Sequence, residues 1–228
     1  MPQKVSFPAI LGGQGMGEIA LPEREDKAPA VVLLHEWWGL NDHVRATMER
    51  LAEAGFVALA LDLYHGKVTD DPSEASQLIH ALDWSRALLE ISGAVYYFLA
   101  EHERVNGKIG AVGFSMGGAF CFSAAATIPR LAAAVPFYGI PGQATDYTRV
   151  KAPILAHFAA RDTWAKPALA RAIQKELTAC GQPMELHVYD ADHAFMNDTR
   201  PEAYHPQAAH LAWARTIEFL RRHLGSAE

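Results

Sequence analysis

Residues 107–118 read Gly-Lys-Ile-Gly-Ala-Val-Gly-Phe-Ser-Met-Gly-Gly, and this stretch decides the expected fold. The apolar run from Lys108 to Phe114 predicts a buried strand, and residues 119–126 predict a buried helix directly after it. Ser115 stands at the turn between them, with Gly113 and Gly117 two residues away on either side. A serine in this setting is a candidate nucleophile.

The glycines around Ser115 have a steric explanation. In so tight a turn the nucleophile takes a strained backbone conformation, and its neighbours have no room for a Cβ atom. This G-x-S-x-G turn is the nucleophile elbow of α/β-hydrolases. It holds the hydroxyl at a helix N-terminus, where the N–H of Met116 and the helix dipole can stabilise an oxyanion. A dinucleotide-binding loop needs G-x-G-x-x-G, a spacing that this glycine-rich stretch does not have.

The composition is that of a globular protein with a substantial core. Of 228 residues, 50% are hydrophobic and 20% are charged. We expect a single domain over residues 1–228. A net charge of −6 argues against nucleic acid or an anionic membrane as a partner. No signal-peptide or membrane-spanning run is recognisable, and the two cysteines, Cys121 and Cys180, make no disulfide framework, so we expect a cytoplasmic protein.

Strand-like and helix-like segments alternate along most of the chain. After an N-terminal hairpin over residues 3–21, apolar runs predict strands at 30–34, 56–61, 108–114, 131–138, 152–158 and 184–189. Helices are expected at 43–54, 73–83, 85–103, 119–126, 166–180 and 201–224. This alternation predicts an α/β fold with a mostly parallel sheet and helices on both faces. Functional groups should then gather at the C-terminal ends of the strands.

Four groups that could take part in catalysis follow the expected strands: Glu36, Ser115, Asp162 and His193. A serine hydroxyl is hardly nucleophilic at neutral pH, so it needs a base, and the base needs an orienting group. In α/β-hydrolases these groups follow one another in the order serine, acid, histidine. We therefore expect Ser115 to be the nucleophile, His193 the base and Asp162 the acid.

Other residues could fill two of these positions. Asp146 is an alternative acid, although it does not directly follow a strand, and Asp162 could instead be only a helix N-cap. The alternative histidines lie within a strand or on or near the terminal helix: His187, His205 and His210. The position of His193 after the last strand favours it.

The second oxyanion donor is expected in the loop after the strand at 30–34. This loop reads His-Glu-Trp-Trp-Gly over residues 35–39, and the backbone N–H of Trp37 has the required position. Because no second histidine follows His35-Glu36 at the right spacing, the loop is not an H-E-x-x-H zinc site.

These motifs together resemble the dienelactone hydrolase family over nearly the whole chain. The markers are residues 35–41 (His-Glu-Trp-Trp-Gly-Leu-Asn), Asp62-Leu63-Tyr64, residues 107–118, Phe137-Tyr138-Gly139, Arg161-Asp162 and Asp192-His193-Ala194-Phe195. The resemblance implies an α/β-hydrolase core without a large lid that hydrolyses lactones or small esters, with no metal or cofactor. It also implies that Glu36 faces the nucleophile and influences its resting state.

Two features depart from the family pattern. The best-known members use cysteine where this chain has Ser115, and Glu36 bears there on thiol ionisation. Beside a serine, Glu36 could hydrogen-bond the hydroxyl, position water or be purely structural. The type enzymes also hold the carboxylate of dienelactone with arginines, whereas no arginine lies here between Arg50 and Arg86. Arg200 could reach the site, but the sequence does not show that it does, so dienelactone is not the expected natural substrate.

Aromatic residues near the strand ends predict an apolar substrate cleft, although most could equally belong to the core: Trp37, Trp38, Tyr64, Tyr138, Trp164 and Phe195. The sequence is thus interpreted as a serine hydrolase of a small-molecule lactone or carboxylic ester. An acyltransferase or a peptidase could use the same triad. A non-catalytic ligand-binding scaffold is a further alternative, which the intact triad disfavours.

Overall fold

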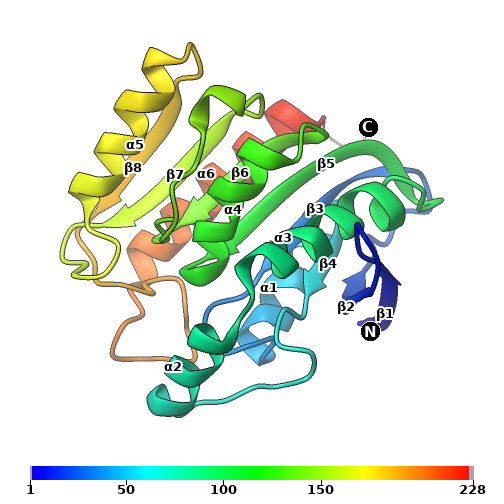
Figure 1. The fold of residues 1–228 in the computed structure, drawn as a ribbon, viewed down its shortest axis with the longest axis horizontal. Helices are drawn as coiled ribbons and strands as arrows, with labels where there is room; N and C mark the ends of the chain where they lie inside the picture. The colour runs from blue at the N-terminus through cyan, green and yellow to red at the C-terminus, as the bar shows by residue number, and fades with distance from the viewer. Residues whose placement is uncertain (1, 226–228) are drawn as a thin grey trace.

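The computed structural model describes residues 2–225, which form an eight-stranded sheet with helices on both faces (Figure 1). The strand order is β1-β2-β4-β3-β5-β6-β7-β8. Only the β1–β2 and β2–β4 pairs are antiparallel, so the predicted, mostly parallel α/β fold is confirmed. The strands are β1 (Gln3–Pro8), β2 (Gln14–Ala20), β3 (Ala28–Leu34), β4 (Val57–Leu61), β5 (Val105–Phe114), β6 (Leu131–Phe137), β7 (Ile154–Ala159) and β8 (Met184–Tyr189).

Helices α3 (Trp84–Gly93), α4 (Met116–Thr127) and α5 (Pro167–Ala179) cover one face of the sheet (Figure 1). Helices α1 (Asp42–Glu53) and α6 (Pro206–Leu224) cover the other. Helix α2 (Pro72–Ala81) lies beyond the C-terminal edge of the sheet and buries only Ala75. Every residue of β3 and β4 is buried, as expected for strands covered on both faces. None of the helices within residues 2–225 combines the length and the apolar character that crossing a membrane requires.

The topology creates a crevice at the C-terminal edge. Strand β3 lies between β4 and β5, so the chain continues from β3 to one neighbour and later returns to the other. The helix after β3 lies on one face and the helix after β5 on the opposite face. Since Leu34 pairs with Gly113, the two strands end at the same level. Ligands bind at such switch points in open α/β sheets.

Most segment boundaries differ from expectation by a few residues, and three of these differences have a clear structural explanation. The helix expected over 85–103 ends at Gly93 and continues as a π-helical segment, Ala94–Leu99. At Gly93 an added Cβ would lie 2.3 Å from the carbonyl oxygen of Pro8, so the hairpin packs against the helix backbone there. Strand β5 begins at Val105 because this buried residue already pairs with Ala28 of β3; the exposed residues 106–108 form an irregularity before Ile109 pairs with Ala30. Helix α6 begins at Pro206 rather than 201, because His205 caps it.

A buried polar chain joins β7, β8 and α6. His157 is fully buried, with Nδ1 2.8 Å from the Tyr189 hydroxyl and Nε2 3.1 Å from Thr216 Oγ1. Thr216 donates its own proton to the Ala212 carbonyl, so Nε2 of His157 carries the ring proton and Nδ1 accepts from Tyr189. Burial, reinforced by nearby His187, lowers the pKa of His157 well below its ordinary value.

This burial predicts a loss of stability in acid. The pKa of His157 is lowered on folding, so below about pH 6.5 the unfolded chain binds a proton that the folded chain does not. The free energy of unfolding should therefore decrease as the pH is lowered. His157 contributes at most about 1.4 kcal/mol per pH unit to this decrease. Urea unfolding between about pH 7.5 and about pH 5.5 measures the slope.

Two variants isolate the contribution of His157. His157→Gln keeps a donor and an acceptor but does not titrate, so it should reduce the slope, to which His35 still contributes. His210→Gln removes an exposed histidine of α6 instead and should leave the slope at its wild-type value. An unchanged slope in His157→Gln would contradict the assignment.

Candidate active site

Ser115 occupies the turn between β5 and α4 in a strained conformation. Its φ is 52° and its ψ is −111°, a region that residues with a side chain rarely adopt. A Cβ on Gly113 would lie 2.1 Å from the Gly117 carbonyl oxygen, and one on Gly117 would lie 2.2 Å from the Leu34 carbonyl oxygen. Both glycines of the motif are thus required because backbone segments meet at this point.

The structure brings the three predicted triad residues together. Ser115 Oγ lies 2.9 Å from His193 Nε2, and His193 Nδ1 lies 2.6 Å from Asp162 Oδ2. They come from the segments after β5, β8 and β7, respectively. The Asp162 side chain has no exposed surface, whereas the His193 side chain is 27% exposed. A buried carboxylate therefore orients an imidazole that the solvent can reach.

Asp162 also organises its own loop. Its second oxygen, Oδ1, accepts hydrogen bonds from the backbone N–H groups of Trp164 (2.8 Å) and Ala165 (2.9 Å). Asp162 is not the helix N-cap that the sequence left open as an alternative, because α5 begins at Pro167 and Lys166 is its N-cap residue. Asp146, the alternative acid, instead caps the short 3₁₀ turn Tyr147–Arg149.

The alternative histidines lie elsewhere. His187 is on β8 with its ring stacked on that of His157, 5.9 Å between centroids. His205 caps α6 by accepting the N–H of Ala208, and His210 is exposed on α6.

Arg161 pairs with Asp190 and, at 3.0 Å, with Asp192. This pairing joins the loop of Asp162 to the loop of His193.

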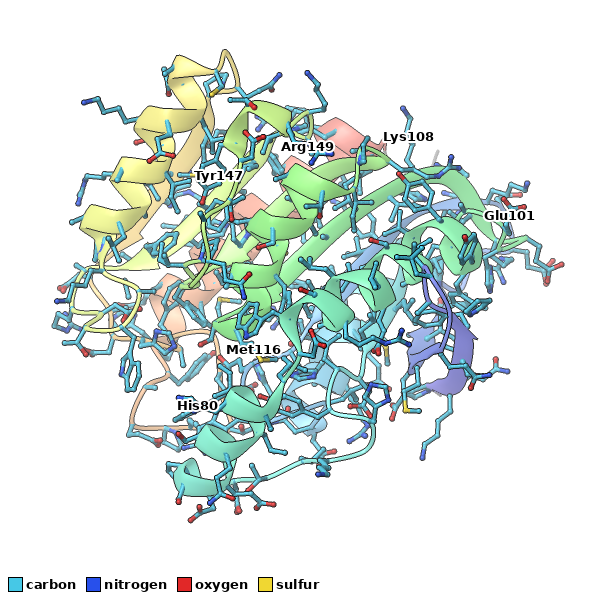
Figure 2. All side chains as sticks on the ribbon, in the orientation of Figure 1. His80, Glu101, Lys108, Met116, Tyr147 and Arg149 are labelled. Atoms are coloured by element: carbon cyan, nitrogen blue, oxygen red, sulfur yellow. The ribbon has the colours of Figure 1, made fainter. Side chains whose placement is uncertain are left out.

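The two predicted oxyanion donors border the same site. Met116 is the first residue of α4, so its N–H has no partner carbonyl within the helix (Figure 2). The N–H of Gly117 donates to the His35 carbonyl at 3.1 Å, which draws the loop after β3 against the elbow. Trp37, two residues further on, lines the pocket that contains Ser115.

The buried His35 ring holds the loop after β3 in place through two hydrogen bonds. Its Nε2 accepts the N–H of Leu63 at 3.2 Å, and its Nδ1 lies 2.5 Å from the Glu36 carbonyl oxygen. Nδ1 therefore carries the proton, and the ring ties the end of β3 to the end of β4. Burial lowers the pKa of His35, which keeps the ring neutral.

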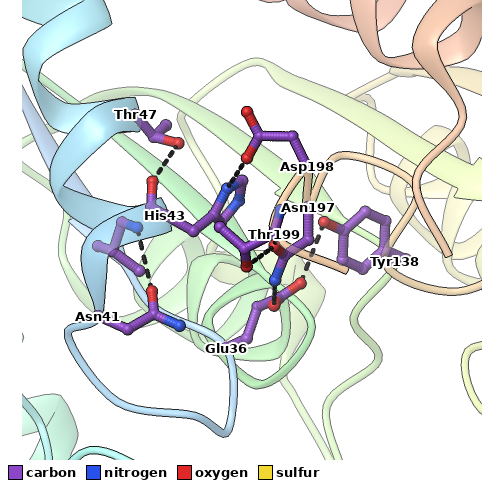
Figure 3. Close-up of polar contacts among 9 residues, drawn as sticks. Glu36, Asn41, His43, Thr47, Tyr138, Asn197, Asp198 and Thr199 are labelled. Atoms are coloured by element: carbon purple, nitrogen blue, oxygen red, sulfur yellow. Dashed lines mark hydrogen bonds and ion pairs between the residues drawn. The ribbon is translucent and has the colours of Figure 1, made fainter. Parts of the chain in front are cut away.

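Glu36 lines the pocket but is held by other side chains. The Tyr138 hydroxyl donates to Oε1 at 3.2 Å, and Asn197 Nδ2 donates to Oε2 at 2.8 Å (Figure 3). Within residues 2–225, no hydrogen bond joins Glu36 to Ser115. Burial, together with the nearby Glu36 carboxylate, raises the pKa of Tyr138 well above its ordinary value. The carboxylate therefore has two firm neutral donors.

The pocket at Ser115 and His193 has a volume of about 590 Å³. Three of the predicted cleft residues line it: Trp37, Trp38 and Trp164. The prediction is wrong for the other three, Tyr64, Tyr138 and Phe195, which are buried in the core and do not line the pocket. A hollow of similar volume, about 630 Å³, lies beside β2 and α1 but contains none of the four strand-end groups.

Several pocket residues were missed by sequence reasoning. They come from α2 and the start of α3: Ser76, Ile79, His80, Leu82 and Trp84. Figure 2 shows His80 on α2 and Met116 at the start of α4 at the same end of the sheet. Ile79, Leu82 and Trp84 are apolar and could have indicated a wall of the pocket. The sequence did not indicate, however, that α2 and the start of α3 lie over the crevice. Arg200, which was left open, does line the pocket, with its guanidinium carbon 3.5 Å from the centroid of the Trp38 ring.

Comparisons with known proteins agree with this geometry. The model of the dienelactone hydrolase family matches residues 16–224. A putative carboxymethylenebutenolidase of Aquifex aeolicus is 32% identical over 218 residues, which cover 91% of this chain and 93% of that protein. A probable 2-oxo-3-(5-oxofuran-2-ylidene)propanoate lactonase of Bradyrhizobium sp. is 31% identical over 229 residues, 93% of this chain and 91% of the relative.

A solved structure is also similar over its full length. The crystal structure of a putative dienelactone hydrolase from Klebsiella pneumoniae superposes with a TM-score of 0.88 at 26% sequence identity. The match covers 97% of this chain and 98% of that one.

The contacts of Glu36 predict a difference between two tyrosine variants. Tyr138→Phe leaves one oxygen of a buried carboxylate without its donor and should lower the free energy of unfolding by about 1–3 kcal/mol. Tyr64→Phe is the matched control, because the Tyr64 hydroxyl donates to the Met116 thioether, a weak acceptor. Urea unfolding of both variants tests this, and equal losses would refute the role given to Tyr138.

Proposed function

The chain belongs to the dienelactone hydrolase family, and we propose that it is a serine hydrolase that cleaves a lactone or a small carboxylic ester. The observation that carries the proposal is the continuous contact from Ser115 through His193 to Asp162, at 2.9 and 2.6 Å, in the wall of a pocket. This arrangement is the one that activates a serine for acyl transfer.

In the proposed reaction, Ser115 Oγ attacks the carbonyl carbon while His193 Nε2 takes the hydroxyl proton. Asp162 holds the opposite ring nitrogen and stabilises the imidazolium. The N–H groups of Met116 and Trp37 stabilise the oxyanion of the tetrahedral intermediate. The intermediate collapses as His193 returns the proton to the leaving alcohol. Water then attacks the acyl-enzyme with His193 again as base, and Ser115 is regenerated.

We assign Glu36 a positioning role rather than nucleophile activation. Both of its oxygens are occupied, one by Tyr138 and the other by Asn197, which follows His193 by four residues. Asn197 Oδ1 in turn accepts from Thr199 Oγ1 at 2.6 Å (Figure 3). Glu36 thus anchors the loop that carries the base. A serine nucleophile does not have to form a thiolate, so Glu36 is not needed to control ionisation of the nucleophile.

We further propose that Arg200 pairs with a carboxylate of the substrate. Two relatives, a putative carboxymethylenebutenolidase and a probable propanoate lactonase, are named after substrates that carry a carboxyl group. Arg200 lines the pocket, and its guanidinium is held against Trp38. Such a flat, oriented guanidinium suits a carboxylate. The missing arginines of the family pattern are thus replaced from another loop.

Covalent labelling tests the activated serine. A fluorophosphonate should add once, at Ser115, and should fail to label Ser115→Ala, as measured by intact mass and peptide mapping.

Asp162→Asn should lower kcat on 4-nitrophenyl acetate by about 10⁴-fold, because the amide favours the wrong tautomer of His193.

A folded protein that neither reacts with the probe nor hydrolyses the ester would refute the proposal. Near-ultraviolet circular dichroism of each variant provides the control for folding. Asp146→Asn alters the alternative acid, which caps the 3₁₀ turn Tyr147–Arg149 and has no contact with the triad among those seen in residues 2–225, so it should keep wild-type kcat.

The role of Arg200 predicts a selective effect on charged substrates. Arg200→Gln should lower kcat/KM for 4-nitrophenyl hemisuccinate by about tenfold, mostly through KM, because a hydrogen bond to a charged group is lost. Turnover of uncharged 4-nitrophenyl butyrate should change much less. The exposed Arg171→Gln on α5 is the control for loss of a positive charge. Equal effects on both substrates would exclude a carboxylate partner.

A further inference from the structure

We propose that the substrate carries an aromatic ring within one or two bonds of its reacting carbonyl, and that the Trp164 indole covers this ring. The inference rests on the proposed ester or lactone hydrolysis at the same site. Four of the chain's five tryptophans line this pocket: Trp37, Trp38, Trp84 and Trp164. They come from three separate segments, so the clustering is a property of the folded site.

Trp164 is the residue that singles out a recognition role. Its relative exposure is 76%, although a large apolar side chain gains most free energy when it is buried. Its backbone is not loose, because its N–H donates to Asp162 Oδ1 at 2.8 Å. The indole is therefore presented to the pocket mouth from a fixed base, with an apolar face that a bound ligand would cover.

The aromatic wall begins at the reacting carbonyl. Trp37 supplies the proposed oxyanion N–H, and its ring lies 4.9 Å from Trp38 and 6.3 Å from Trp164, measured between centroids. The interplanar angles are 65° and 56°, so the three indoles present both faces and edges. Aromatic rings prefer such edge-to-face and offset neighbours. A ring adjacent to the carbonyl would meet this wall directly.

Another part of the pocket wall is apolar, beside the polar residues Ser76, His80 and Arg200. Trp84 stacks on the buried Phe120 with 4.1 Å between ring centroids, and Ile79 and Leu82 lie beside it in the pocket lining. These groups would accept any apolar body. Discrimination between a planar and a saturated ring must therefore come from the tryptophans, and from Trp164 in particular, since it is the most exposed of the four.

Binding can be measured without turnover. Calorimetry on Ser115→Ala protein should show that ethyl phenylacetate binds about two- to tenfold more tightly than ethyl cyclohexylacetate, the magnitude expected of one aromatic pair. The preference should disappear in Ser115→Ala/Trp164→Leu and persist in Ser115→Ala/Trp164→Phe. Trp213→Leu in the same background is the matched control, because Trp213 lies under Arg50 and away from the pocket. Equal affinities for the two esters would overturn the proposal.

Turnover separates this inference from the proposed function. In protein with Ser115 intact, the ratio of kcat/KM for the phenyl over the cyclohexyl ester should exceed unity by the same factor and fall towards unity in Trp164→Leu. If 4-nitrophenyl acetate is hydrolysed while this ratio is near unity, the triad functions and the aromatic preference is wrong. If no ester is cleaved but the phenyl ester still binds preferentially, the hydrolase assignment fails and the aromatic site stands.

Discussion

The site depends on how closely three backbone segments meet around Ser115. A Cβ on Gly117 would lie 2.2 Å from the Leu34 carbonyl oxygen, and one on Gly139 would lie 2.1 Å from the Ser115 carbonyl oxygen. With no side chain between them, the end of β3, the start of α4 and the segment after β6 have a fixed separation. The Gly117 N–H then binds the His35 carbonyl, so the turn that carries Ser115 and the loop that faces it form one rigid unit. The position of Ser115 therefore follows from backbone packing rather than from the flexible ends of side chains.

The architecture and the grouping of Ser115, His193 and Asp162 could be predicted from the sequence because both leave a local pattern. Strands covered on both faces are continuous apolar runs, as in β3 and β4, and the groups at their C-terminal ends follow directly in the chain. The order of Ser115, Asp162 and His193 needs only the topology, so the structure could place them within hydrogen-bond distance as expected. No spacing rule, in contrast, distinguishes an aromatic residue above a strand end from one below it. Tyr138 and Phe195 therefore belong to the core, whereas Trp164 is exposed.

What the sequence could not provide comes from contacts between distant segments. The helix after Trp84 changes to a π-helix where Gly93 meets the Pro8 carbonyl, a contact that links the hairpin to the middle of the chain. Arg200 reaches the pocket because the loop after His193 folds back, with Asn197 bound to Glu36 and the His205 N–H bound to the Phe195 carbonyl. Neither contact has a signature in the residues next to it.

Helix α2 combines a small structural role with a large share of the pocket. It buries only Ala75, yet Ser76, Ile79 and His80 line the cavity. Ile79 packs against the core, but Ser76 and His80 do not belong to it, so substitutions at these two positions alter the cavity with little effect on folding. After a gene duplication, substitutions within this one short helix would be enough to change the substrate specificity of one copy. The elbow, where every backbone contact is constrained, would remain fixed while that divergence took place.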